Sequence, residues 1–136
     1  MRWNNIGHEF DDFWQEIKDI QEVYIFGAGL IGKSAIKTLE DEIIINGILD
    51  NDSAKIGNTF CGYNVYSPNV VENNIPVIVC VPPEAMRSVV GQLSDQGFKI
   101  YDVHKYLPVY FMYQHNRLVL TSISYLPTTV CNLKCK

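Results

Sequence analysis

Residues 22–32 have the sequence Glu22-Val-Tyr-Ile-Phe-Gly27-Ala-Gly29-Leu-Ile-Gly32, and this stretch decides the fold. The first five residues are typical of a short apolar strand, and residues 33–39 are typical of a helix. Glycines spaced G-x-G-x-x-G between a strand and a helix form the turn that receives the phosphates of a dinucleotide. Gly27 permits the sharp bend, Gly29 lets a phosphate approach the backbone, and Gly32 lets the helix pack closely on the strand.

A carboxylate follows at the separation that such a turn needs. Residues 43–50 are predicted to form a second strand, which ends at Asp50, eighteen positions after Gly32. At the carboxyl end of that strand, Asp50 is placed to accept hydrogen bonds from a ribose. Its charge opposes a 2′-phosphate, so the pattern favours NAD(H) over NADP(H), and the nearby Lys55 weakens that preference.

The rest of the chain continues the alternation of strands and helices. Residues 53–66 are rich in Gly, Asn and Ser, which favours a turn and a hairpin over a crossover helix. Residues 76–81 are a continuous apolar run, typical of a strand buried on both faces, and residues 83–96 are predicted to be a helix. With a last strand at 99–103, the pattern predicts an α/β, Rossmann-like domain with a mostly parallel sheet of about five strands flanked by helices.

The loop after the second strand carries a more specific resemblance. Residues 47–57, Gly-Ile-Leu-Asp-Asn-Asp-Ser-Ala-Lys-Ile-Gly, are followed by Gly-Tyr-Asn-Val at 62–65 and Ser-Pro at 67–68. This segment resembles the small N-terminal domains of acyltransferases acting on UDP-amino sugars, and related modules of polysaccharide-biosynthesis proteins. The resemblance implies a nucleotide-sugar pocket but transfers no catalytic residue, because those lie in another domain of the family. It implies a pocket lined by Gly27, Gly29, Gly32, Asp50, Asn51, Asp52 and Lys55.

The last residues, Cys131-Asn-Leu-Lys-Cys135-Lys136, contain two of the three cysteines of a C-x-x-x-C-x-x-C pattern. Thiolates are the usual ligands of iron–sulfur clusters. The alternatives are two ordinary small residues, or half of a zinc site, although the sequence has no second ligand pair for zinc.

The residues before these cysteines identify a family. A strand-like run at 118–126 and Thr-Thr at 128–129 precede them, and this arrangement resembles the opening of radical S-adenosylmethionine (SAM) enzymes. The resemblance implies that Cys131, Cys135 and a third cysteine at position 138 hold a [4Fe–4S] cluster, with SAM on the fourth iron. We therefore expect residues 118–136 to be the truncated start of a radical SAM domain belonging to a parent enzyme, with no catalysis in the fragment itself.

Two segments flank the predicted Rossmann-like domain at 22–107. Residues 1–21 are predicted to contain a packing helix, from apolar residues spaced three and four apart. Residues 108–117 are predicted to be an aromatic linker, within an aromatic stretch that begins at residue 106. Without the missing radical SAM domain this stretch would expose an apolar patch, so we expect the C-terminal segment to be disordered in solution or to be ordered by pairing of two copies of the chain through residues 106–125.

Composition narrows the classes of function. The chain of 136 residues is 47% hydrophobic and 19% charged, as in a soluble globular protein. Its net charge of −4 and the lack of a basic stripe argue against nucleic acid as a partner. No apolar run is long enough to span a membrane, no signal peptide is evident, and the four cysteines suggest no disulfide framework, so we expect a cytoplasmic protein.

The histidines have no companions at metal spacing, and His104 is the best placed of them.

Three functional hypotheses follow. In the first, the domain binds a nucleotide or nucleotide-sugar at the head of a radical SAM iron–sulfur enzyme. In the second, it binds NAD(H) as a redox module. In the third, it is an inert structural or interaction domain whose glycines serve packing alone.

Overall fold

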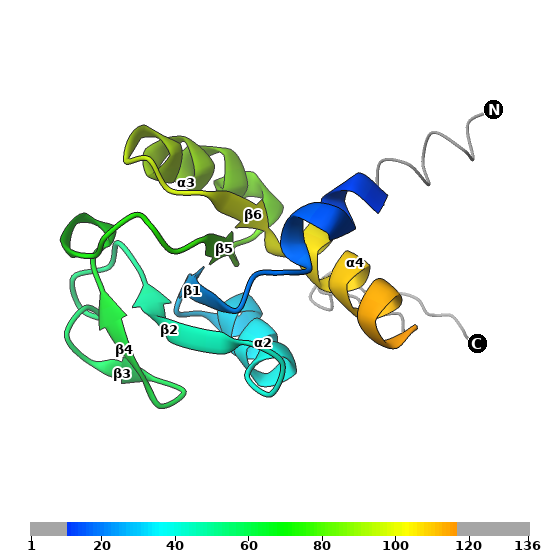
Figure 1. The fold of residues 1–136 in the computed structure, drawn as a ribbon. Helices are drawn as coiled ribbons and strands as arrows, with labels where there is room; N and C mark the ends of the chain where they lie inside the picture. Colours follow the sequence, from blue (N-terminus) through cyan, green and yellow to red (C-terminus); the bar gives the residue numbers. More distant parts are fainter. Residues whose placement is uncertain (1–10, 117–136) are drawn as a thin grey trace, which may run out of the picture.

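The computed structural model describes residues 11–116, and they form a sheet of six strands flanked by helices (Figure 1). The strand order is β3-β4-β2-β1-β5-β6, and every neighbouring pair is parallel except β3 and β4. The predicted α/β class with a mostly parallel sheet is confirmed. The strands are β1 Glu22–Phe26, β2 Ile44–Leu49, β3 Thr59–Phe60, β4 Tyr63–Tyr66, β5 Val77–Val79 and β6 Ile100–Asp102.

The helices lie where the hydrophobic periodicity and the turn residues place them, with one exception described below. Residues 11–17 are helical, within the predicted N-terminal packing helix. The others are α2 Leu30–Leu39, the 3-10 helix η1 Pro68–Val70, α3 Pro83–Asp95 and α4 Val103–His115. Helix α2 begins three residues earlier than the sequence predicted, so the glycine-rich turn is itself the helix N-terminus. Within residues 11–116, no helix combines the length and the apolar character needed to cross a bilayer.

Both faces of the sheet are covered by hydrophobic clusters. Successive residues of a strand point to opposite faces, so a single strand contributes to both clusters. In β1, Val23 and Ile25 belong to one hydrophobic cluster, whereas Phe26 belongs to the other. The first cluster includes residues of α2, α4 and the 11–17 helix, and the second includes Leu93 of α3. Figure 1 shows α2 and α3 on opposite faces of the sheet.

The connection from β2 to β4 is a turn and a short hairpin, as predicted for residues 53–66. Cys61 and Gly62 form the hairpin tip, with φ of 53° and 87°. Two consecutive positive φ angles are what the commonest two-residue hairpin turn requires. The hairpin supplies two strands in place of one crossover helix, which raises the count from about five strands to six.

The sequence analysis assigned residues 108–117 to a linker, and the structure corrects this assignment up to His115. Val103–His115 is a helix that begins at Asp102, whose side chain accepts a hydrogen bond from the His104 amide. Its buried residues recur at the helical spacing of three and four. They are Val103, Tyr106, Leu107, Val109, Tyr110 and Phe111. Pro108 inside the segment conceals this pattern, because proline normally ends or kinks a helix.

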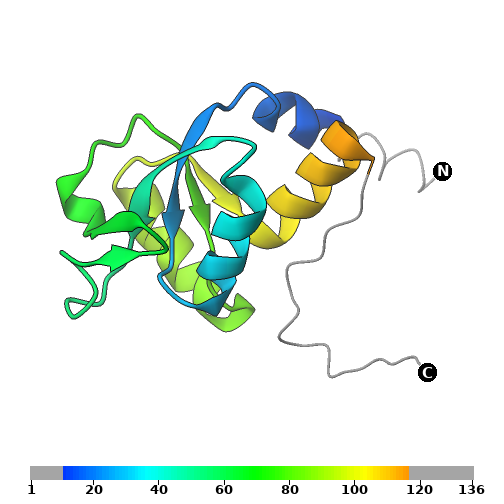
Figure 2. The same cartoon turned by 90° about the horizontal axis from the view of Figure 1, so that it is seen from below.

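Helix α4 therefore packs its aromatic residues on its own domain. Tyr106 and Tyr110 are stacked with ring centroids 5.8 Å apart, and Trp14 of the 11–17 helix packs on both Tyr110 and Tyr113. Figure 2 shows the 11–17 helix lying alongside α4. The aromatic patch that we expected to drive association is buried over residues 106–111, and residues 117–125 lie outside the described part of the chain.

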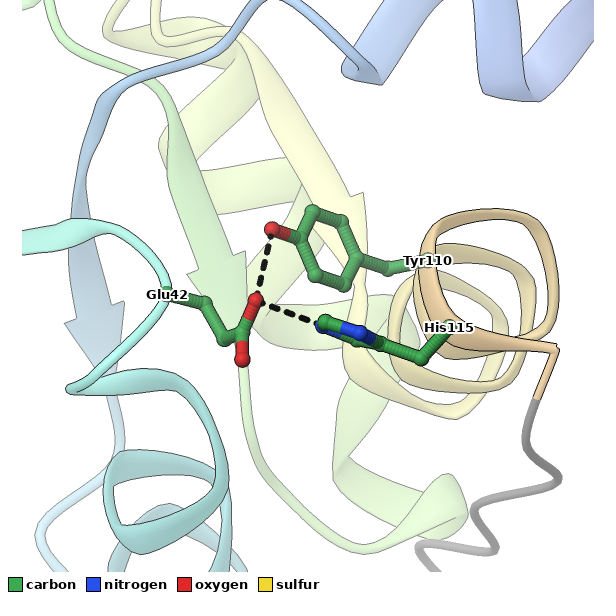
Figure 3. Close-up of polar contacts among 3 residues, drawn as sticks. All are labelled: Glu42, Tyr110 and His115. Atoms are coloured by element: carbon green, nitrogen blue, oxygen red, sulfur yellow. Dashed lines mark hydrogen bonds and ion pairs between the residues drawn. The ribbon is translucent and has the colours of Figure 1, made fainter.

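Polar contacts tie the end of α4 to the turn before β2 (Figure 3). The Tyr110 hydroxyl donates a hydrogen bond of 3.2 Å to Glu42 Oε1, and His115 Nε2 lies 2.8 Å from the same oxygen. The helix ends one residue later, at Asn116 in a left-handed conformation. These contacts hold the last turn of α4 against the amino-terminal end of the sheet.

Candidate functional site

The candidate site lies at the carboxyl end of β1, the strand at which the strand order changes sides: β2 and β4 lie on one side of β1, and β5 and β6 lie on the other. Strand β1 pairs with β2 on one side and with β5 on the other. Ligands of open α/β sheets bind in the crevice at such a switch point. A cavity of about 410 Å³ opens there. Its lining residues are Gly27, Ala28, Gly29, Leu30, Ile31, Asp50, Lys55, Cys80, Val81 and Pro82.

Two of the three fingerprint glycines are required by packing within the domain. Gly27 has a φ of 118°, and a Cβ atom there would lie 2.4 Å from the Cys80 carbonyl oxygen of the neighbouring strand segment. A Cβ atom at Gly32 would lie 1.9 Å from the Gly27 carbonyl oxygen. Both positions exclude any other residue, whether or not a ligand binds.

Gly29 is different, because nothing in the described structure requires a glycine there. Its φ of −134° and ψ of −161° are extended values that any residue adopts, and no atom lies within 4 Å of a Cβ built on it. Gly29 is also the N-cap of α2, so no N-cap side chain occupies the first N–H groups of the helix. The helix N-terminus attracts anions, and the missing side chain leaves a phosphate room to approach.

Asp50 and Lys55 enter the cavity from the loop after β2, and both contact the glycine-rich turn. Asp50 Oδ2 accepts a hydrogen bond of 2.8 Å from the Ala28 amide, and Asp50 Oδ1 accepts one of 2.8 Å from the Asp52 amide. Lys55 Nζ donates a hydrogen bond of 2.9 Å to the Ala28 carbonyl oxygen. The structure thus brings these two predicted residues together with Gly27 and Gly29, through contacts that sequence spacing did not predict.

Asn51 and Asp52, which the family resemblance also assigned to the site, point elsewhere. The Asn51 and Gln92 side chains exchange hydrogen bonds of 2.7 and 2.9 Å, which join the loop to α3. Asp52 Oδ1 accepts a hydrogen bond of 2.9 Å from the Ala54 amide. Neither side chain is among those lining the 410 Å³ cavity.

The opposite wall of the cavity comes from the end of β5. Cys80 is buried, and this burial raises the pKa of its thiol far above the usual range, so the thiol stays protonated and acts as a small apolar group. His104 Nε2 lies 3.3 Å from the Val81 carbonyl oxygen, and His104 is not one of the residues that line the cavity. The exposed side chain of Leu30, in the first turn of α2, also lines the cavity. Sequence analysis missed the lining roles of Leu30 and Val81, although both lie inside motifs that it identified.

Two other observations bear on alternative sites. A larger cavity of about 530 Å³ is lined by the segment that leads into β5 and by Gln96 and Phe98, which precede β6. It lies near the amino ends of these strands, away from the carboxyl-end crevice that ligands of this fold use. Among residues 11–116, no group of three or more His, Cys, Asp or Glu side chains is arranged to hold a metal ion. Cys131 and Cys135 lie outside the described residues, so the iron–sulfur assignment stays a prediction.

Of the comparisons with known proteins, the one with solved structures supports the fold. No family model matches the chain, and no curated protein matches it. Among solved structures, UDP-D-quinovosamine 4-dehydrogenase from Vibrio fischeri is similar, with a TM-score of 0.51 and 18% identity over 77% of this chain and 96% of that one. RSP in complex with β-NAD⁺ and operator DNA has a TM-score of 0.49 and 21% identity, over 70% of this chain and 50% of that one. RSP described as a Rex-family repressor has a TM-score of 0.49 and 15% identity, over 82% and 68%.

At these identities the similarity concerns the fold alone, and the scores for RSP are too low to carry an argument. Together with the strand order, the match to the dehydrogenase establishes that the described part of this chain has a Rossmann-like α/β fold.

Proposed function

We propose that this domain binds a nucleotide, a nucleotide-sugar or NAD(H), with the phosphate of the ligand against the turn at Gly29. The observation that carries the proposal is the steric contrast among the three glycines. Gly27 and Gly32 are required by contacts within the protein, whereas Gly29 borders only the open cavity. A glycine with no internal partner, at the uncapped start of a helix, leaves the space that a phosphate occupies.

A second cavity supports a ligand that extends beyond its phosphate. It has a volume of about 270 Å³ and lies on the other side of the loop after β2, at the carboxyl end of β4. Its walls include the apolar side chains of Ile56, Val65, Tyr66 and Val70. Such an apolar lining suits the flat base of a nucleotide. This arrangement favours a nucleotide over a small free anion.

The three hypotheses from the sequence make different predictions for a ligand panel. Thermal-shift measurements with UDP-sugars, NAD(H), NADP(H), SAM and mononucleotides distinguish them, because a ligand that binds only the folded state raises its melting temperature. Stabilisation by UDP-sugars favours the nucleotide-sugar module, and stabilisation by NAD(H) favours the redox module. A panel in which nothing stabilises the protein supports the inert domain and overturns this proposal.

Substitution of Gly29 gives the direct test. Gly29→Ala is expected to leave the fold intact and to weaken binding of the stabilising nucleotide at least about tenfold, since the methyl group occupies the path of the phosphate. Gly91→Ala in α3 is the matched control, because a Cβ atom there also has no neighbour within 4 Å. It should retain full affinity. A Gly29→Ala protein that binds as tightly as the control would remove the phosphate from this turn.

The link to a radical SAM enzyme remains a proposal that rests on residues 128–136, Thr-Thr-Val-Cys-Asn-Leu-Lys-Cys-Lys. We propose that Cys131 and Cys135 are two ligands of a [4Fe–4S] cluster in the parent protein. The test is the iron and acid-labile sulfide content of the protein expressed from its whole gene. Cys131→Ala and Cys135→Ala should abolish the cluster, whereas Cys61→Ala, at the hairpin tip, should retain it. A cluster that survives both substitutions would disprove the assignment.

A further inference from the structure

Two charged side chains of the loop after β2 bind the backbone of Ala28 in the glycine-rich turn, one at its N–H group and the other at its carbonyl oxygen. The Asp50 carboxylate accepts the hydrogen bond of the Ala28 N–H, and the Lys55 ammonium donates to the Ala28 carbonyl oxygen, at 2.8 and 2.9 Å. Ala28 is buried, with 6% of its surface exposed. Its two backbone polar groups are therefore both held by charged partners that lie 22 and 27 residues away in the sequence.

Ala28 lies in the most flexible kind of backbone. Gly27 precedes it and Gly29 follows it, and glycine has more conformational freedom to lose on folding than any other residue. A turn that had to be ordered by its ligand would lose that entropy at the moment of binding, and the affinity would fall accordingly. Hydrogen bonds that fix Ala28 in the ligand-free protein remove this cost.

The loop that supplies the two side chains is itself braced. The Asp52 amide donates to Asp50 Oδ1, and the Lys55 amide donates to the Asp52 carbonyl oxygen at 2.9 Å. Asp50 and Lys55 are thus held at a defined separation, and together with Ala28 they form one hydrogen-bonded unit.

We propose that Asp50 and Lys55 are positioning residues, which hold the glycine-rich turn in its phosphate-binding shape before a ligand arrives. This inference rests on the proposed function, because it explains how the same turn recognises a phosphate. It differs from the sequence prediction, in which Asp50 acts by accepting hydrogen bonds from a ribose. In this proposal Asp50 binds the glycine-rich turn, which contacts the phosphate, and needs no contact with a ribose.

Asp50→Asn separates positioning from simple charge, because the two effects have opposite signs. Removing a negative charge beside an anion site should strengthen anion binding by electrostatics alone. Positioning predicts the reverse, since the asparagine amide has a single, neutral oxygen and cannot offer separate carboxylate oxygens to the Ala28 and Asp52 N–H groups. Inorganic pyrophosphate is the decisive probe, because it has neither a ribose nor a base.

Titration calorimetry of the full chain with inorganic pyrophosphate provides the measurement. Asp50→Asn is expected to weaken pyrophosphate binding about tenfold or more, the scale of one lost charge-assisted hydrogen bond. Asp52→Asn is the charge-matched comparison, because it removes the same charge two residues away and keeps an oxygen for the Ala54 amide. It should bind pyrophosphate as tightly as the wild type or more tightly. Equal or tighter binding by Asp50→Asn overturns the positioning role.

A ligand-free measurement separates this inference from the proposed function. Amide hydrogen exchange at Ala28 should be faster in Asp50→Asn than in the wild type and in Asp52→Asn, because a neutral amide oxygen is a weaker acceptor for the Ala28 N–H than a carboxylate oxygen. Lys55→Met should weaken pyrophosphate binding, and Lys55→Arg should restore part of it by donating again to the Ala28 carbonyl oxygen. Unchanged Ala28 exchange in Asp50→Asn overturns the positioning role, whereas a wild-type protein that does not bind pyrophosphate overturns the proposed function.

Discussion

The glycine-rich turn and helix α4 are built in opposite ways. The turn, at the carboxyl end of β1, is made of backbone, with two glycines forced by close contacts and a third left open to a cavity. Helix α4 is made of large side chains, which bury Tyr106 and Phe111 to 0 and 1% exposure. The turn borders an open cavity, whereas α4 buries most of its aromatic side chains in the hydrophobic core. The proposed ligand site and the largest buried aromatic side chains therefore lie in different parts of the domain.

The largest expected effect tests whether α4 stabilises the domain. Phe111→Ala should destabilise folding by about 3–5 kcal/mol, because it empties a fully buried aromatic site. Met112→Ala is the control, since this neighbouring side chain is 42% exposed, and it should change stability by less than about 0.5 kcal/mol. Denaturant unfolding measures both. If the two variants were equally stable, α4 would be a peripheral segment, as the linker prediction held.

The next effect tests whether packing on β5 shapes the turn. Gly27→Ala should destabilise the domain by more than about 1–3 kcal/mol, the range for backbone strain alone, because its Cβ also meets the Cys80 carbonyl oxygen. Gly57→Ala isolates the strain, since Gly57 has a φ of 91° and no atom within 4 Å of a Cβ. Thermal unfolding should therefore rank Gly27→Ala well below Gly57→Ala. Equal losses would show that the contact with Cys80 is relieved by a small shift.

A smaller effect concerns the polar contacts that hold the end of α4. Burial, together with the Glu42 carboxylate, raises the pKa of Tyr110 to about 12 from its usual value of 10.0. A raised folded-state pKa means that this contribution to stability is complete below about pH 10 and is lost as the pH rises toward 12. Tyr110→Phe should cost about 0.5–1.5 kcal/mol at neutral pH, the worth of a typical hydrogen bond.

Alkaline unfolding curves measure this contribution. Tyr110→Phe should show a weaker loss of stability above pH 10 than the wild type. An identical alkaline dependence in the two proteins would contradict the role of the Tyr110 hydroxyl.

The smallest effect concerns the ion pair between the 11–17 helix and the start of β6. A hydrogen bond from Lys99, at 2.9 Å, lowers the pKa of Glu16, and the Tyr101 hydroxyl donates to the same oxygen. A lowered pKa stabilises the fold above the ordinary value of 4.5, and this contribution disappears as the pH falls through the folded-state value. Since both side chains are largely exposed, solvent screening limits the effect to below about 1 kcal/mol.

Glu16→Gln should remove this acid-dependent contribution and leave stability at low pH unchanged. Urea unfolding at neutral and acidic pH provides the measurement. If Glu16→Gln lost as much stability with falling pH as the wild type, the dependence would belong to other carboxylates.

The sequence by itself determined the features that are encoded locally. The spacing of Gly27, Gly29 and Gly32 after an apolar strand specified a glycine-rich turn that leads into a helix, because this pattern between a strand and a helix is a local signature. The continuous apolar run around β5 specified a strand buried on both faces, and Pro83 specified the start of α3. These signals are short-range, so they survive without knowledge of the rest of the fold.

Only the tertiary structure decided the features that depend on residues far apart in the chain. The 103–111 pattern identifies a helix once the sheet and the 11–17 helix are in place to cover it, whereas Pro108 and the aromatic composition suggest a linker when the segment is considered alone. Likewise, the spacing between Gly32 and Asp50 predicted a carboxylate near the turn, but not that it would bind Ala28. That contact exists because parallel pairing brings the carboxyl ends of β1 and β2 to the same edge of the sheet.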